Sequence, residues 1–414
     1  MKQKRWYKLD NSGKIFPPIT NEYDTCVFRI SCTLKETING PMLQKALEKT
    51  LVDFPVFNSV LKRGFFWYYI ESVSNTKKVS PECQPICDNI RGILYRVTYF
   101  QNRINLEVSH ALTDGYGATV FLRCLVANYL KATHNIETEE EIDIASTYEK
   151  SEDAFKKYYK KFKKHKSNIF KKSYKVKGNV YDDYRLKIIE TTSDLDKSLA
   201  LAKENNCTIT EFLTAILLKS ILSTMTERDK TKPIYITIPV SLRKEFPTYT
   251  TRNFFCTMEI AYKHKGNDEL SEIIDEIKNQ FKNELQRENL YSKMSEMIFL
   301  ESFFICRIVP RVIKDFVLRT SYKITRRTHT MTLSNIGRIT MPKVYEEYID
   351  NFCFHSSTDG IQLNIISFEN KMKMSFSSHF VNSEIQKEFI RQLNKMGVEF
   401  VVDTNILENE NDKM

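Results

Sequence analysis

The stretch INLEVSHALTDGYGA, residues 104–118, decides how the chain is interpreted. Ile104, Leu106 and Val108 alternate with polar residues, which predicts a strand with one buried face. His110 continues that face, so a titratable ring follows where the pattern expects an apolar side chain. Asp-Gly-Tyr-Gly then interrupts the strand, and an apolar helical stripe begins after Gly117.

A histidine in such a place has two interpretations. The ordinary one is a core histidine whose hydrogen bonds are satisfied. The alternative is a functional group at a strand end, held by the loop with Asp114 and Gly115 before the helix. The rest of the chain has to decide between them.

Length and composition favour a folded protein of two domains. The chain has 414 residues, of which 42% are hydrophobic and 12% aromatic, enough for two domains of about 200 residues each. No apolar run reaches the roughly 18 residues of a membrane span, and no apolar segment follows the basic start as in a secretory signal. Nine scattered cysteines without metal-site spacing indicate reduced thiols, so we expect a cytoplasmic protein without a bound metal.

The connection between the halves is rich in lysine. The net charge is +10, and eleven lysines lie between Lys156 and Lys177. Phe155, Tyr158, Tyr159 and Phe162 have helical spacing, which predicts an amphipathic helix with a basic outer face. We expect a solvated linker here. The alternative is a patch over 156–177 for a membrane surface or an acidic carrier protein, and no motif favours nucleic acid. We therefore predict domains 1–178 and 179–414.

Four segments together resemble the coenzyme A (CoA)-dependent acyltransferase superfamily. They are LEKTLVDFPVFNSVLKRG, the His-x-x-x-Asp-Gly motif at 110–115, IPVSLRKEFPTYTTRNFF and MTLSNIG. The superfamily includes chloramphenicol acetyltransferase, condensation domains of peptide synthetases, and the alcohol acetyltransferase and polyketide-associated branch, which the chain resembles most. The resemblance implies an α/β (α+β) fold of two chloramphenicol-acetyltransferase-like domains, each a mixed, mostly antiparallel sheet covered by helices. The two form a pseudo-dimer within a monomer, with the site between them.

The resemblance also implies roles for individual residues. His110 would be the general base, because acyl transfer needs a base of near-neutral pKa for the acceptor's proton. Asp114 would form a structural ion pair with an arginine, first of all Arg338, with Arg243 and Arg252 as the next candidates. Gly115 would allow a backbone conformation or a close approach that a Cβ blocks. Ser334 and Asn335 would contact the oxyanion or the pantetheine arm, or else form only a polar strand end.

A second copy of the motif occurs at His355–Gly360. A strand follows its Asp-Gly, which is typical of a turn between strands, so we do not expect this copy to be catalytic. Condensation domains usually carry another histidine just before the catalytic one, and here that residue is Ser109. P-loop, dinucleotide and Gly-x-Ser-x-Gly motifs are absent.

These observations predict an acyltransferase that moves an acyl group from acyl-CoA, a co-substrate and not a bound cofactor, to an alcohol or amine. Two alternatives stay open. One is a condensation-type enzyme that takes its donor from a carrier protein, and the other is a non-catalytic binding derivative of the fold.

Overall fold

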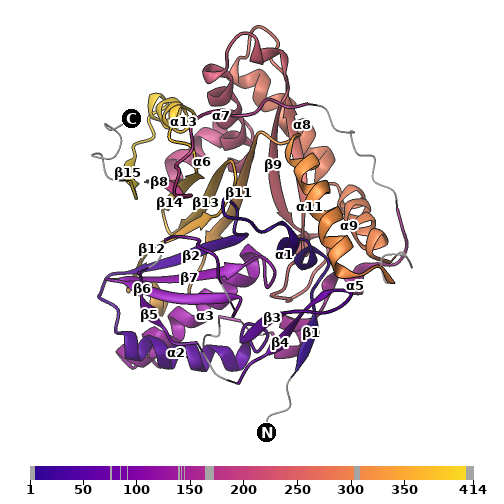
Figure 1. The fold of residues 1–414 in the computed structure, drawn as a ribbon. Coiled ribbons are helices and arrows are strands. Elements are labelled where there is room, and N and C mark those ends of the chain that lie inside the picture. The colour runs from indigo at the N-terminus through magenta and orange to yellow at the C-terminus, as the bar shows by residue number, and fades with distance from the viewer. Residues whose placement is uncertain are drawn as a thin grey trace.

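The computed structural model describes residues 5–74, 77–83, 85–90, 92–138, 140, 142–143, 145–163, 172–302 and 308–406. Its strands form three sheets, and Figure 1 shows the two larger ones in a lower and an upper half of the molecule, each with its own helices.

The lower half is built on a five-stranded sheet of order β12-β2-β7-β6-β5. Its strands are β2 (Val27–Leu34), β5 (Ser80–Pro81), β6 (Tyr95–Phe100), β7 (Arg103–Ser109) and β12 (Ile349–Ser356). The expected hairpin is confirmed: β6 and β7 pair antiparallel across Gln101 and Asn102. Two helices, α2 (Gly40–Asp53) and α3 (Gly115–His134), pack against this sheet in one hydrophobic core.

The upper half is built on a seven-stranded sheet of order β10-β9-β11-β13-β14-β8-β15. Its strands are β8 (Lys187–Asp194), β9 (Ile234–Ser241), β10 (Phe255–Tyr262), β11 (Met331–Ile339), β13 (Ile361–Phe368), β14 (Lys371–Ser378) and β15 (Val401–Thr404). Strand β11 runs parallel to both its neighbours and every other pair is antiparallel. The helices α6 (Leu195–Glu204), α7 (Ile209–Thr224), α8 (Leu270–Glu284) and α13 (Glu384–Lys395) belong to this half, and the predicted capping box of Thr208 and Glu211 begins α7.

Smaller elements lie around the two halves. A three-stranded antiparallel sheet joins β1 (Trp6–Lys8), β4 (Tyr68–Ser72) and β3 (Ser59–Arg63). The remaining helices include α9 (Arg287–Ser302) and α11 (Arg311–Arg326), which Figure 1 shows on the right flank. The short elements are η1 (Ser12–Lys14), α1 (Phe16–Ile19), α4 (Thr147–Ser151), α5 (Ala154–Tyr158), η2 (Asp229–Thr231), η3 (Leu242–Lys244) and α12 (Lys343–Glu346).

Strand β12 ties the halves together. It follows β11 in the chain, yet it pairs with β2 at the edge of the lower sheet, from Ile349 opposite Leu34 to Ser356 opposite Phe28. The second half of the sequence therefore supplies part of the first sheet. The boundary between 1–178 and 179–414 stays a prediction.

The lysine-rich stretch is less helical than the sequence analysis expects. Helix α5 ends at Tyr158, and the chain then runs along α9, where the hydroxyl of Tyr291 accepts from the backbone N–H groups of Lys160 and Lys161 at 3.2 and 3.1 Å. The predicted helix through Phe162 is therefore wrong, because contacts with α9 replace helical hydrogen bonds. Residues 164–171 of the stretch lie outside the described residues.

Among the described residues, no single helix is long and apolar enough to cross a membrane, and one bent pair, α6 with α7, passes that test by length and composition alone. The eight cysteines in the described part form no disulfide.

Candidate active site

A cavity of about 520 Å³ lies between the two large sheets. Strands β9, β10, β11 and β13 of the upper sheet line it together with β2, the residues after β7, the start of α3, α1 and α11. Its walls include His110, Asp114, Gly115, Ser334, Asn335 and Arg338, so the structure gathers in one cavity the site residues that the sequence predicts.

His110 follows the last residue of β7, at the point where the strand gives way to the loop. Its backbone is held on both sides: its N–H donates to the Cys26 carbonyl at 2.9 Å, and its own carbonyl accepts from Asn253 Nδ2 at 2.9 Å. Cys26 precedes β2 and Asn253 comes from the second half of the chain. Both halves therefore fix the position of this residue.

Aromatic rings surround the imidazole of His110. Phe16 stacks on it with ring centroids 4.8 Å apart, Phe28 lies at 4.5 Å, and Phe255 lies at 6.3 Å. Nδ1 is buried and makes no hydrogen bond within the described residues, and the residue forms part of the cavity wall.

This burial lowers the pKa of His110 to about 4, although the negative charges of Asp114 and Asp24 act in the opposite direction. The imidazole is therefore neutral at pH 7 and can accept a proton there. The ring is thus deprotonated at pH 7, as a general base must be, but its pKa lies well below the near-neutral value that the sequence analysis expects, because the ring is desolvated.

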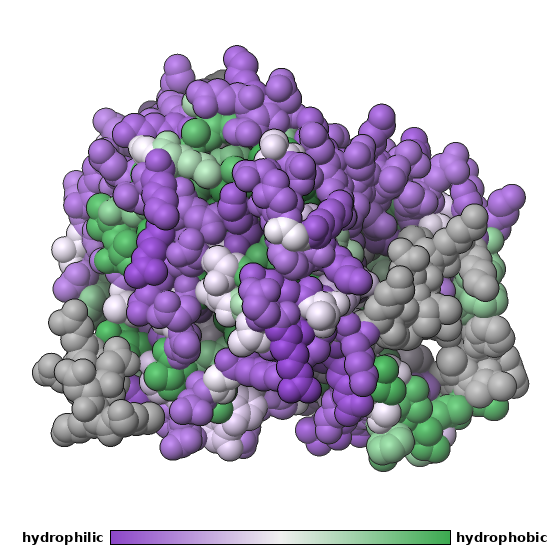
Figure 2. Space-filling view, turned by 90° about the horizontal axis from the view of Figure 1, so that it is seen from above, coloured by the Kyte–Doolittle hydropathy of each residue, from purple (hydrophilic) through white to green (hydrophobic). Residues whose placement is uncertain are grey.

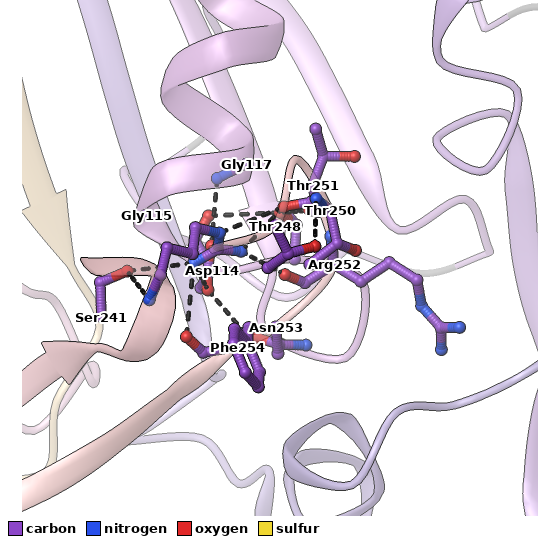
Figure 3. A network of polar contacts seen from close by, with 12 residues as sticks. Asp114, Gly115, Gly117, Ser241, Thr248, Thr250, Thr251, Arg252, Asn253 and Phe254 are labelled. Atoms are coloured by element: carbon purple, nitrogen blue, oxygen red, sulfur yellow. Dashed lines mark hydrogen bonds and ion pairs between the residues drawn. The ribbon is translucent and has the colours of Figure 1, made fainter. Parts of the chain in front are cut away.

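Asp114 is the N-cap of α3, and all its polar contacts are structural. Oδ1 accepts from the Gly117 N–H at 3.0 Å, and Oδ2 accepts from the Phe254 N–H at 2.8 Å, as Figure 3 shows. Arg243 adds a fork of two bonds, from Nη1 to Oδ2 at 2.8 Å and from Nη2 to Oδ1 at 3.2 Å. Because both oxygens are occupied in this way, Asp114 fastens the His110 loop to the second half of the chain.

The prediction that Arg338 pairs with Asp114 is wrong, because Arg243, the second candidate, occupies that place. Arg243 lies in η3, directly after β9, and its Nη2 also donates to the carbonyls of Thr250 and Arg252 at 3.0 and 2.6 Å. The Arg338 side chain is exposed at an edge of the cavity. The Arg252 guanidinium, the third candidate, lies 3.7 Å from Asp10 instead.

The glycine that the backbone requires is Gly117, not Gly115. A Cβ on Gly117 would lie 2.0 Å from the Thr251 carbonyl oxygen and 2.2 Å from Thr113 Oγ1. A Cβ on Gly115 would meet only the Ile336 side chain at 3.6 Å, which is an ordinary contact. The close approach expected at Gly115 is therefore found two residues later, and Gly115 instead leaves room in the cavity wall.

Ser334 and Asn335 lie on β11 but differ in what they can offer. Asn335 Nδ2 donates to Thr210 Oγ1 at 3.0 Å, and its Oδ1 accepts from the Gly337 N–H at 2.8 Å across a β-bulge. The Ser334 hydroxyl lines the cavity and makes no hydrogen bond within the part of the chain that the structure describes. Ser334 is thus the better placed of the two to donate to a bound molecule.

The cavity contains polar residues that the sequence analysis missed. His329 Nδ1 lies 2.5 Å from Thr237 Oγ1, and burial lowers the pKa of His329 to about 4 with help from the nearby charges of Lys175 and Arg326. Arg326 Nε donates to Asp359 Oδ2 at 2.6 Å. No spacing in the sequence links these residues, since they come from α11, β9 and the loops around β11 and β13.

His355, in the second copy of the motif, lies on β12 and is not among the residues that line the cavity. Its Nε2 lies 2.9 Å from Glu190 Oε2, and Lys373 Nζ donates to Glu190 Oε1 at 2.7 Å. Burial alone would raise the pKa of Glu190, but the hydrogen bonds and charges of His355 and Lys373 lower it overall. This position supports the prediction that His355 is not catalytic.

Within the described residues, no group of three or more His, Cys, Asp or Glu side chains is arranged to hold a metal ion. The cavity offers two histidines whose pKa is lowered, His110 and His329, together with a serine hydroxyl and arginines.

Comparisons with known proteins concern the whole chain. No family model matches the sequence, and no curated protein sequence matches it. Solved structures do. Polyketide synthase associated protein 5 from Mycobacterium tuberculosis is 14% identical with a TM-score of 0.66, and the match covers 94% of this chain and 96% of that one. TRI101 from F. sporotrichioides, solved with coenzyme A and T-2, is 10% identical with a TM-score of 0.64 over 96% and 99% of the chains. The first condensation domain of the CDA synthetase is 10% identical with a TM-score of 0.58 over 95% and 96%.

These matches span both halves of the chain. The predicted fold class is therefore confirmed: the chain has the two-domain α/β fold that is seen in polyketide synthase associated protein 5, TRI101 and the condensation domain.

Proposed function

Starting from this shared fold, we propose that the chain is an acyltransferase that moves an acyl group from acyl-CoA to an alcohol or an amine. The observation that supports it most is the neutral His110 ring, packed among aromatic rings and open to a cavity between the two sheets. The TRI101 match was solved with coenzyme A, which is consistent with CoA as a co-substrate.

In the proposed reaction, His110 Nε2 accepts the proton of the acceptor's hydroxyl or amino group as that group attacks the thioester carbonyl. A carbon–oxygen or carbon–nitrogen bond forms, and the carbonyl oxygen becomes an oxyanion. The Ser334 hydroxyl is our candidate donor to that oxyanion, where removal of one donor costs about 3 to 4 kcal/mol in other enzymes. When the intermediate collapses, the carbon–sulfur bond breaks and the CoA thiolate takes the proton from His110.

Asp114 has no part in these proton transfers. Its oxygens are occupied by Arg243 and by two backbone N–H groups, so it acts by holding the loop that carries His110. Residues from both halves of one chain line the cavity, and we therefore propose that the monomer is the active unit.

A second candidate is a condensation-type enzyme whose donor is attached to a carrier protein. The match to a condensation domain favours it, whereas Ser109 in place of the additional histidine argues against it. The lysine-rich stretch would have to receive the acidic carrier, but Lys156, Lys157 and Lys163 already lie within 2.8 to 3.1 Å of acidic side chains. We therefore favour free acyl-CoA.

A thiol-release assay tests the proposal. Short, medium and long acyl-CoAs are each offered with a panel of alcohols and amines, and the same acyl groups are offered on a carrier protein. We expect acceptor-dependent release of CoA. Transfer only from the carrier protein would select the second candidate, and saturable acyl-CoA binding without any turnover would select the non-catalytic derivative.

A further inference from the structure

Helix α11 and the tip of the β3–β4 hairpin carry an apolar surface away from both cores. Phe65 is 72% exposed, and Val312 and Phe316 are each 69% exposed. With Phe66, Ile313 and Val317, which are also exposed, they form what we call the α11–hairpin face. Figure 2 shows hydrophobic atoms gathered at the lower right edge, on the side where α11 lies in Figure 1. Exposed apolar groups in such a cluster mark an interaction surface.

Hydrogen bonds join the tip of the hairpin to the first turns of α11. The Arg311 N–H donates to the Phe65 carbonyl at 2.9 Å, and Lys314 Nζ donates to the Phe66 carbonyl at 2.8 Å. Arg311 Nη1 also donates to Asp315 Oδ2 at 2.7 Å, where the Tyr68 hydroxyl donates as well. In the first turns of α11 the polar Lys314 and Asp315 are therefore buried, whereas the apolar Val312, Ile313 and Phe316 are exposed, which is the reverse of an ordinary surface helix.

Cations border the apolar side chains. Lys62 and Arg63 on the hairpin, Arg319 and Lys323 on α11, and Arg327 at its C-cap are exposed, and Arg319 Nε also donates to the Pro18 carbonyl at 2.7 Å. The acidic residue of α11, Asp315, is buried in its ion pair with Arg311. Arg319 and Lys323 follow Val312 and Phe316 at helical spacing, so apolar and basic residues share one side of the helix.

We propose that the α11–hairpin face docks the protein on an anionic phospholipid membrane. Apolar side chains at the level of the lipid headgroups, with lysine and arginine beside them, are the combination that holds an amphipathic helix at an interface. A second copy of the chain is a poorer occupant, because a two-fold interface would bring two faces of the same positive charge together.

The proposed docking is independent of the reaction at His110, but it has a consequence for it. Tyr322 and Arg326, in the last turns of α11, line the cavity. If the proposed function holds, a membrane bound at this face lies beside the cavity, where a lipid-soluble acceptor or a long acyl chain could enter.

Vesicle sedimentation tests the docking with the full-length protein and without substrate. The vesicles contain phosphatidylcholine alone, or phosphatidylcholine and phosphatidylglycerol in equal amounts. We expect binding to the anionic vesicles that weakens as salt is raised. The double variant Val312→Ser, Phe316→Ser should lower the partition coefficient on the order of tenfold, because two anchors are lost.

Matched controls separate this face from other surfaces. Val401→Ser, Val402→Ser removes two exposed apolar side chains on β15 and should leave binding unchanged. Arg319→Glu, Lys323→Glu should weaken binding to anionic vesicles, whereas Lys160→Glu, Lys161→Glu in the lysine-rich stretch should not. Thermal melting of each variant verifies its fold.

Three results would overturn the proposal: no binding of the wild-type protein to anionic vesicles, equal loss in the α11 and control variants, or a dimer in sedimentation equilibrium that the Val312→Ser, Phe316→Ser variant abolishes. The sedimentation experiment contains no substrate, and acyl transfer is measured separately on soluble substrates. A failure of the proposed acyltransferase function would therefore leave the test of membrane docking unaffected.

Discussion

The variant Asp114→Asn tests how the site is held. In the wild-type protein the two oxygens of Asp114 accept from Gly117, Phe254 and both Nη atoms of Arg243. An asparagine replaces one oxygen with an NH₂ group, which then faces a backbone N–H and a guanidinium N–H. Donors meet donors, and the buried cation of Arg243 loses its counter-charge.

The magnitude follows from burial. The side chains of Arg243 and Asp114 are only 8% and 7% exposed, so solvent cannot replace the lost partner. Breaking such a buried pair from one side costs about 3 to 5 kcal/mol. At about 2 to 4 °C per kcal/mol for a domain of this size, the melting temperature should fall by roughly 6 to 20 °C. Activity should fall with it, since the pair joins the His110 loop to the second half of the chain.

The assay is thermal melting together with kcat/KM for the best substrate pair. Arg338→Gln is the matched control, because this exposed arginine lies at the cavity edge but does not pair with Asp114. It should leave the melting temperature unchanged. If Asp114→Asn melts like the wild-type protein while its turnover falls as far as that of His110→Ala, Asp114 takes part in the chemistry and our assignment is wrong.

Four further predictions concern the glycines of the loop, His110 and His355. Gly117→Ala should lower the melting temperature because its Cβ would meet the Thr251 carbonyl, whereas Gly115→Ala should keep it; equal melting of the two would contradict the geometry. Because the pKa of His110 is lowered from 6.5 to about 4, kcat/KM should hold below pH 6.5 and fall only towards pH 4, and an acid limb centred near 6.5 would show that the ring is not buried in solution. Between pH 6.5 and pH 4, His110 binds a proton in the unfolded chain but not in the folded one, so its contribution to the free energy of unfolding should decrease as the pH falls. Denaturant titrations of the wild-type protein and of His110→Ala measure this contribution as the difference between the two. His355→Ala should melt earlier, because it removes a partner of buried Glu190, yet keep the kcat of the wild-type protein; loss of turnover in the folded variant would assign His355 to the site.

Local patterns predicted the parts of the fold that local physics determines. The alternation of apolar and polar residues predicted β7, and the apolar stripe after Gly117 predicted α3. Both patterns repeat over residues that are close together in the sequence, so they can be recognised without the rest of the fold. The strand-loop-helix context also selected His110 over His355, and the structure places only His110 in the cavity wall.

Features that depend on distant packing could not be predicted in this way. Several arginines were available to Asp114, and only the position of η3 beside the loop selects Arg243. The need for glycine at position 117 comes from Thr251, which lies far along the chain. Strand β12 pairs with β2, in a sheet whose other strands come from the first half of the sequence, and nothing in the residues of β12 predicts which sheet it joins.

The most direct test of the central claim is the rate of acyl transfer by His110→Ala, measured on folded protein with the best acyl-CoA and acceptor. Loss of a general base lowers the rate on the order of 100-fold or more. We expect that loss in kcat. The melting temperature should fall only by the small amount that follows from losing the packing of the His110 ring against its aromatic neighbours. Transfer at the wild-type rate by folded His110→Ala would contradict the account.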